Sequence, residues 1–219
     1  MPLSIVVQSI LFVVLVAVAL FAAAGTVAIV GFWIYVAIYF AAFVVSLAIL
    51  DPDLLRERMR PGGQRLPNAL RFFTVILFAH WIVAGLDRGR FHWSDTVPDW
   101  LQAAGLIATA AGYAFALWAM RINRFFSSVV RIQSDRGQHV ITTGPYAFVR
   151  HPGYLAGFVI ILASGIALGS WLAELVLVIP CIPGLIYRAV TEDRVLHAEL
   201  PGYSDYASKV RWRVLPGVW

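Results

Sequence analysis

Residues 155–187 read LAGFVIILASGIALGSWLAELVLVIPCIPGLIY, which is two apolar runs joined by Gly169-Ser170. Apolar runs of this length predict helices, and a glycine at the joint permits a tight reversal of the chain. As a helix, the run 155–169 would extend only about 22 Å at 1.5 Å per residue. The hydrocarbon core of a bilayer is about 30 Å thick. We therefore expect a helical hairpin whose first member is short for a full crossing.

Four other apolar runs come before this hairpin, and the composition is that of a membrane protein. Of the 219 residues, 60% are hydrophobic and 13% are charged, whereas about a quarter of the residues in soluble domains are charged. The sequence predicts an all-α fold, a polytopic membrane helix bundle with about six apolar helical segments, a cytoplasmic catalytic loop and a C-terminal tail. The predicted segments are 5–24, 32–50, 69–86, 100–120, 155–169 and 171–187.

The basic residues collect in alternate loops. Fifteen of the seventeen Lys and Arg residues, Arg60 and Arg65 among them, lie between the second and third runs or at the start of the third (Arg71), between the fourth and fifth, or after the sixth. Basic residues favour the cytoplasmic side of a membrane, so both termini and the active site are predicted to be cytoplasmic. The net charge of +5 then reflects topology, and no nucleic-acid partner is expected. The heavy use of arginine over lysine suggests a GC-rich bacterial genome, and the predicted location is therefore a bacterial inner membrane.

The first run ends in Ala22-Ala23-Ala24-Gly25, which resembles the cleavage site of a signal peptide. No Lys or Arg precedes the run, and the run is longer than a typical signal core. We therefore expect a retained membrane span. We divide the chain into N-terminal transmembrane helices at 1–98 and a catalytic membrane region with the cofactor site at 99–219.

Residues 143–154, TGPYAFVRHPGY, place polar groups directly before the hairpin. The residue before a proline avoids the helical region, and proline is favoured at the first helical position. His151 is therefore predicted to cap the fifth helix and Pro152 to begin it. Free N–H groups at that helix start, together with Arg150 and His151, would hold a carboxylate or another anion. Each residue alone also fits an ordinary interfacial role, and only the grouping favours a site.

Glu192 and Asp193 are predicted to follow the sixth helix directly. Acids at the C-terminal end of a helix oppose its dipole, which suggests that another group holds them there. A hairpin would bring them beside Arg150 and His151, so that acid and base groups share one pocket. The alternative is a solvated helix end with Arg188 paired to Glu192. The chain has no Cys and His spacing typical of a metal site, and none is predicted.

These motifs, in this order and spacing, resemble the isoprenylcysteine carboxyl methyltransferase and phospholipid methyltransferase superfamily. The resemblance implies a membrane enzyme that takes S-adenosylmethionine from the cytosol and methylates a lipidic or small apolar acceptor. The cofactor pocket implied by the resemblance comprises His139, Gly144, Pro145, Tyr146, Arg150, His151, Tyr154, Gly157 and Glu192. The candidate catalytic residues are Arg150, Glu192 and Asp193.

The first functional hypothesis is therefore an S-adenosylmethionine-dependent methyltransferase acting on a carboxyl, thiol or amine acceptor that enters from the bilayer. A second is a membrane NADPH-dependent reductase of the sterol type, which shares a related C-terminal architecture. A third is a non-enzymatic transporter or scaffold. The chain shows no evident repeat, and its polar cluster lies at one surface, which disfavours a transporter. Cofactor binding distinguishes the first two hypotheses.

Overall fold

The computed structural model describes residues 3–59, 61–63 and 68–219, and the regular elements there are all helical, as predicted. Arg60 and Arg65, two of the basic residues used to predict topology, lie outside the described residues. The longer helices are α1 (Leu3–Ala24), α2 (Val30–Ile49), α3 (Pro52–Met59), α4 (Asn68–Leu86), α5 (Asp99–Ile122), α6 (Pro152–Ala167), α7 (Trp171–Glu199) and α8 (Tyr203–Lys209). Short helical turns form η1 (Pro61–Gly63), η2 (Asp87–Phe91), η3 (Ser134–Arg136) and η4 (Gly144–Ala147).

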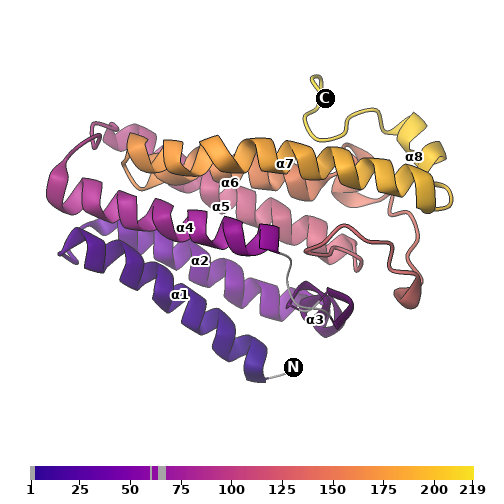
Figure 1. Ribbon diagram of the computed structural model, residues 1–219, viewed down its shortest axis with the longest axis horizontal. Coiled ribbons are helices and arrows are strands. Elements are labelled where there is room, and N and C mark those ends of the chain that lie inside the picture. Colours follow the sequence, from indigo (N-terminus) through magenta and orange to yellow (C-terminus); the bar gives the residue numbers. More distant parts are fainter. Residues whose placement is uncertain (1–2, 60, 64–67) are drawn as a thin grey trace.

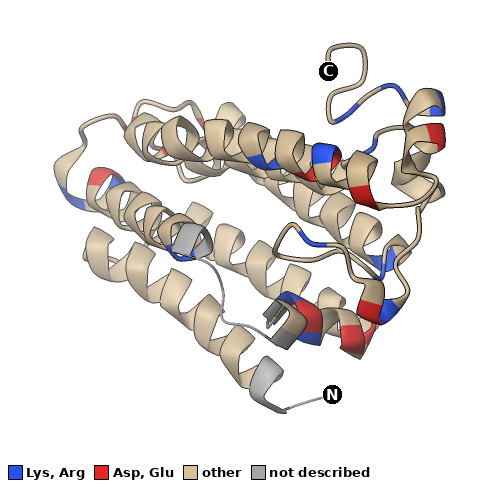
Figure 2. Ribbon diagram, turned by 45° about the vertical axis from the view of Figure 1, so that its right-hand side comes forward, with Lys and Arg blue, Asp and Glu red and all other residues tan. Residues whose placement is uncertain are grey.

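Within the residues that the structure describes, five helices are long and apolar enough to cross a membrane, namely α1, α2, α4 with η2, α5 and α7. A further apolar helix, α6, has only 16 residues and packs against α7. The predicted hairpin with a short first member is therefore confirmed. Figure 1 shows these helices side by side, with the start of α1, α3, α8 and the C-terminal tail at one end of the bundle. Charged residues gather mainly at that end (Figure 2).

Helix α7 is longer than the sequence predicts. It was expected to end at residue 187, but it continues through Glu199 for a length of 29 residues. Glu192 and Asp193 therefore lie inside the helix, and the argument from an unfavourable helix end was wrong. The apolar pattern stops at residue 187, but the helix continues past it with polar and charged residues. The helix itself ends only before Pro201 and Gly202, where proline disfavours a helical residue ahead of it and Gly202 has a positive φ of 81°.

Glycines let the last three long helices approach closely. A Cβ added at Gly165 of α6 would lie 2.3 Å from the backbone nitrogen of Glu174 in α7. A Cβ at Gly105 of α5 would lie 2.7 Å from the backbone nitrogen of Ala167 in α6. Small residues at such crossings are typical of packed membrane helices. The α5, α6 and α7 backbones are therefore closely packed near the turn between α6 and α7.

A polar chain inside the bundle joins four helices. With a neutral ring, His80 of α4 donates from Nδ1 to the Ala173 carbonyl oxygen at 2.8 Å and accepts at Nε2 from the Ser164 hydroxyl at 2.9 Å. Ser164 is also hydrogen-bonded to Tyr35 of α2, whose hydroxyl accepts from Trp81 at 3.2 Å. Buried polar groups need such partners, so the chain fixes how α2, α4, α6 and α7 face one another.

A second cluster holds the turn between α6 and α7 to the loop between α4 and α5. Asp87 is fully buried and accepts hydrogen bonds from the hydroxyls of Ser94 and Ser170, both at 2.5 Å. The Ser170 hydroxyl also caps α7 by accepting from the Ala173 backbone N–H at 3.1 Å. This end of the hairpin, opposite the charged end, is thereby anchored.

The packing at Gly165 gives a stability prediction. We expect Gly165→Ala to lower the free energy of unfolding by about 1–3 kcal/mol, because the added methyl group meets the α7 backbone and forces the helices apart. Thermal unfolding of the detergent-solubilised protein measures the change. Gly31→Ala is the control, since a Cβ at Gly31 meets nothing within 4 Å. Equal melting temperatures for both variants would show that the α6–α7 contact can relax without cost.

Candidate active site

The hairpin brings the predicted acid and base groups together, as the sequence analysis expected. The Arg150 Nε atom lies 3.0 Å from Asp193 Oδ1, and His151 Nε2 lies 3.1 Å from the same oxygen. His151 is the residue before α6 and Pro152 begins that helix, so the predicted helix start is confirmed. The loop before α6 and the last third of α7 therefore share one site.

Asp193 is the centre of a buried ionic cluster. Its side chain is only 3% exposed. Besides Arg150 and His151, it accepts a hydrogen bond from the Tyr203 hydroxyl at 2.8 Å and one from Arg213 Nε at 2.9 Å. Both carboxylate oxygens are thus engaged, and the charge is matched by two guanidinium groups. Asp193 therefore joins α7 to the loop before α6, to the start of α8 and to the C-terminal tail.

The C-terminal tail binds the same loop through its backbone. The Arg150 and His151 N–H groups donate to the carbonyl oxygens of Trp212 and Arg213, each at 2.9 Å. Arg150 Nη1 also donates to the carbonyl oxygens of Val210 and Arg211, each at 3.3 Å. Each side-chain nitrogen of Arg150 therefore has an acceptor within the protein. Through these contacts Arg150 holds the loop before α6 to Asp193 of α7 and to the C-terminal tail.

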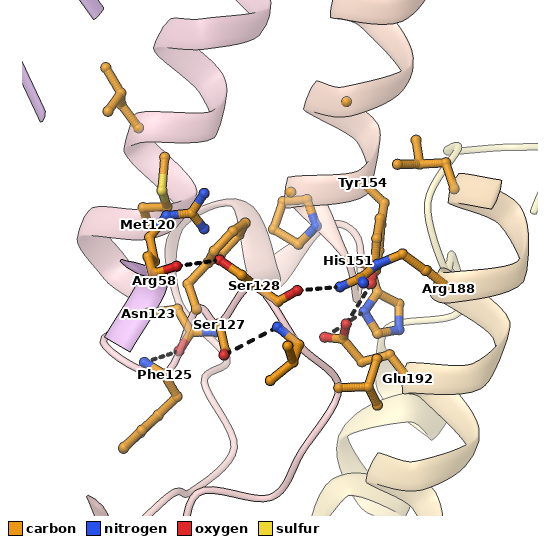
Figure 3. A pocket seen from close by; sticks show the side chains of 18 of the residues that line it. Arg58, Met120, Asn123, Phe125, Ser127, Ser128, His151, Tyr154, Arg188 and Glu192 are labelled. Atoms are coloured by element: carbon orange, nitrogen blue, oxygen red, sulfur yellow. Dashed lines mark hydrogen bonds and ion pairs between the residues drawn. The ribbon is translucent and has the colours of Figure 1, made fainter. Parts of the chain in front are cut away.

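Glu192 points in another direction from its neighbour. Successive residues of a helix are turned by about 100°. Asp193 contacts Arg213 of the tail, whereas Glu192 faces the cavity (Figure 3). The Glu192 side chain is 33% exposed. Its Oε2 accepts from the Tyr154 hydroxyl at 2.6 Å, and its Oε1 lies 3.8 Å from His151 Nδ1. Glu192 keeps acceptor capacity for a ligand.

A cavity of about 870 Å³ connects this polar end with the interior of the bundle. Its deep part is lined by side chains of the predicted membrane spans, including Phe12, Tyr39, Tyr113 and Leu177. Its polar end is lined by Arg58, Asn123, Ser127, Arg131, His139, Arg150, His151, Tyr154, Arg188 and Glu192. A ligand can therefore contact charged groups at one end and apolar side chains at the other.

Most of the predicted site residues line this cavity. Those that do are His139, Tyr146, Arg150, His151, Tyr154, Gly157 and Glu192. Gly144, Pro145 and Asp193 are absent from the lining. Gly144 has a positive φ of 59° and begins η4, the turn that carries Tyr146. Gly144 and Pro145 therefore form the turn that places Tyr146 in the cavity wall, without lining the cavity themselves.

Tyr146 is buried and forms part of that wall. Its hydroxyl accepts a hydrogen bond from Asn123 Nδ2 at 3.0 Å, and its carbonyl oxygen accepts from the Tyr206 hydroxyl at 2.7 Å. Burial raises the pKa of the Tyr146 hydroxyl well above its ordinary value. The phenol therefore stays protonated at neutral pH.

Residues outside the predicted set also shape the cavity. The loop after α5 is tied to α3, where Arg131 Nη2 lies 3.0 Å from Glu57 Oε2 and Arg136 pairs with Asp53. Burial acts to raise the pKa of Glu57, but hydrogen bonds from Arg131, the Gly62 N–H and Ser127 outweigh it and lower the pKa. The partners are more than seventy positions apart in the chain, so spacing along one sequence could not reveal them.

The Asp193 cluster predicts a large cost for removing its charge. We expect Asp193→Asn to lower the free energy of unfolding by about 3–5 kcal/mol, since it leaves buried guanidinium groups unpaired. A denaturant titration in detergent, monitored by the loss of the helical circular dichroism signal, measures the effect. Glu199→Gln on the same helix is the control, because Glu199 is exposed. If Asp193→Asn unfolds at the same denaturant concentration as Glu199→Gln, the cluster does not hold the fold.

Comparison with known proteins bears on this site. Residues 100–200 match the model of the family described as Phospholipid methyltransferase. The nickel-cobalt-cadmium resistance protein NccN of Alcaligenes xylosoxydans xylosoxydans is 30% identical over 130 residues, which cover 58% of this chain and 56% of that protein. The cobalt-zinc-cadmium resistance protein CzcN of Cupriavidus metallidurans is 28% identical over 131 residues, with the same coverage.

The chain thus spans about half the length of the curated relatives it matches. The matched family region begins in α5 and ends directly after α7, so it contains the Arg150–His151 loop, both members of the hairpin and Glu192. This match agrees with the resemblance drawn from the motifs: residues 100–200 match the model of the phospholipid methyltransferase family, which belongs to the isoprenylcysteine carboxyl methyltransferase-like superfamily.

Proposed function

We propose that this protein is an integral membrane methyltransferase that uses S-adenosylmethionine and methylates a lipidic or small apolar acceptor. The observation that carries the proposal is the cavity with two unlike ends. Glu192 and His151 line the polar end, while Phe12 and Leu177 line the part between the membrane helices. A water-soluble cofactor would reach the cavity from the aqueous side and an apolar acceptor from the bilayer, so the two could meet there.

The polar end fits the functional groups of this cofactor. The Glu192 carboxylate would accept hydrogen bonds from the ammonium group or the ribose hydroxyls. His139, His151 and Tyr154 offer ring N–H or hydroxyl groups around it. The rings of Phe125, Phe126 and Tyr203 also line the cavity and offer flat walls for a purine. Arg150 and Asp193 would act as positioning residues that hold the loop in place.

In catalysis the chain would mainly align the reactants and exclude water. When bound, S-adenosylmethionine supplies a methyl group on a sulfonium sulfur, which leaves as a neutral thioether once the acceptor has taken the methyl group. A carboxylate or thiolate acceptor has no proton to lose. An amine acceptor would lose one, and Glu192 is the lining carboxylate in a position to take it.

The other hypotheses have less support. The match of residues 100–200 to a methyltransferase family supports the methyltransferase and gives no support to an NADPH-dependent reductase. The names of NccN and CzcN refer to resistance to metals. Among the residues that the structure describes, no group of three or more His, Cys, Asp or Glu side chains could hold a metal ion. We therefore base the proposal on the family match and the cavity. We further propose a bacterial inner membrane, with the polar end facing the cytosol.

Cofactor binding tests the proposal directly. We expect the purified protein in detergent to bind S-adenosylhomocysteine saturably in isothermal titration calorimetry, and to bind NADPH weakly or not at all. The reverse pattern would replace the methyltransferase by a reductase. Binding of neither ligand by a folded sample would leave the cavity without its proposed cofactor and would contradict the proposal.

Glu192 gives a sharper test of the cofactor site. We expect Glu192→Gln to weaken S-adenosylhomocysteine binding by about tenfold or more, because hydrogen bonds to a charged acceptor are the stronger ones. Its melting temperature should stay near that of the native protein, since Glu192 is partly exposed. Glu199→Gln, two helical turns along α7, should leave the affinity unchanged. An unchanged affinity in Glu192→Gln would remove Glu192 from the cofactor site.

A further inference from the structure

The C-terminal tail after α8 turns back onto the bundle. Figures 1 and 2 show it leaving α8 and returning toward the other helices. Val214 is fully buried and belongs to one cluster with Phe158 of α6 and Ala189 of α7. Ala189 lies two positions past the predicted membrane span, which ends at Tyr187. The tail is therefore packed against the hairpin close to the edge of that span.

Residues 214–219 form a turn that is held by its own hydrogen bonds. The Val214 and Leu215 N–H groups both donate to the main-chain oxygen of Trp219 at 3.0 Å, and the Trp219 N–H donates to the Leu215 carbonyl oxygen at 2.9 Å. The guanidinium carbon of Arg213 lies 5.2 Å from the centre of the Trp219 ring. The turn is therefore a defined element with a fixed place beside the hairpin.

Apolar side chains of this tail are exposed. Val218 is 77% exposed, Trp212 is 38% exposed, and Pro216 is exposed as well. A single exposed apolar side chain is ordinary on any protein surface. Here three of them lie on a short segment packed beside a predicted membrane span, and tryptophan favours the interface between lipid and water. The tail is therefore suited to contact lipid.

The same segment carries positive charge. Residues 206–219 contain three basic residues and no Asp or Glu. Arg213 pairs with Asp193 at 2.9 Å. Lys209 and Arg211 are exposed, and neither forms an ion pair within the part of the chain that the structure describes. Two cations beside the predicted span thus remain free to bind an anion.

We propose that residues 209–219 form a membrane-interface element that binds the head group of an acidic phospholipid. Lys209 and Arg211 contact the anionic head group, and the turn that carries Val218 rests on the acyl chains below it. An acidic lipid surface strengthens the binding of a nearby segment about fivefold for each basic residue. The charge of the tail and its exposed apolar side chains together fit this one partner. The lipid contact is independent of the proposed cofactor and acceptor.

A fluorescent label on the turn tests the contact. Val218→Cys is labelled with the environment-sensitive dye NBD in a Cys181→Ala background, which removes the one cysteine of the sequence. The protein is placed in nanodiscs of phosphatidylcholine alone, or of phosphatidylcholine mixed with phosphatidylglycerol. Some lipids carry a doxyl group near the head group, which quenches the dye on contact. We expect blue-shifted emission and strong quenching in the acidic nanodiscs, and weaker quenching in the neutral ones.

A second label is the control for membrane contact. Ser134→Cys, in the short turn η3, carries the same dye in the same background, because Ser134 is exposed in the polar loop after α5. This label should emit as in water in both kinds of nanodisc. Quenching of the Val218 label in acidic nanodiscs should also fall at high salt, because salt screens the attraction between exposed charges.

Charge variants assign the lipid preference to the tail. Lys209→Gln combined with Arg211→Gln should lower the ratio of quenched to unquenched Val218 label in acidic nanodiscs about tenfold or more, since two basic residues are lost. Arg56→Gln combined with Arg71→Gln is the matched control, because it removes the same charge from exposed residues of α3 and α4. This control should behave like the protein with the native charges.

Three results would overturn the inference. A Val218 label as exposed to water as the Ser134 label would show that the tail does not contact lipid and that its cations are open to a soluble acidic partner. Equal quenching in neutral and acidic nanodiscs would leave an apolar contact without a head-group site. An unchanged lipid preference after loss of Lys209 and Arg211 would assign that preference to other residues. The comparison of the two nanodiscs decides the question even if the charge variant fails to fold.

Discussion

The buried carboxylate of Asp193 is the contact on which the rest of the site depends. Alone in a protein interior, this charge would be strongly unfavourable. Here Arg150, His151, Tyr203 and Arg213 contact it, and they come from the loop before α6, from the start of α8 and from the tail. One ionic centre thus ties together segments that are distant in the sequence. Because these contacts hold α7 in one rotational setting, the next side chain, Glu192, is turned toward the cavity.

The short α6 helix explains how polar groups and an apolar channel come to share one cavity. A helix of 16 residues extends about 24 Å, which is less than the thickness of the apolar layer of about 30 Å. Its far end is anchored through Ser170 to Asp87. A helix shorter than α5 and α7 leaves room before its start. The loop that carries Arg150 and His151 lines the cavity there, next to apolar side chains.

The sequence analysis predicted the helical bundle, the short hairpin and the meeting of Arg150 with the acid pair, because these follow from local patterns. Apolar runs mark helices, and the His151-Pro152 pair marks a helix start. It misjudged the end of α7, because a helix can continue beyond the point where its apolar pattern stops. It also could not predict the partners of Asp193 in the tail or the pairing of Arg131 with Glu57. Such pairs depend on how the helices pack in space, which spacing along one sequence does not encode.

The cavity is built from two parts of the chain that differ in what they share with other proteins. The family match covers residues 100–200, which supply Tyr146, Tyr154 and Glu192 at the polar end. Arg58 and Phe12 line the same cavity but lie outside the matched region. Ion pairs from the loop after α5 hold α3 against the matched part, so both halves form one wall. On the proposed function, the polar end, which comes mostly from the matched region, would hold the methyl donor. Selection among acceptors would then depend on the first half of the chain, where a single exchange at the cavity wall would change which acceptor enters while the donor site stays intact.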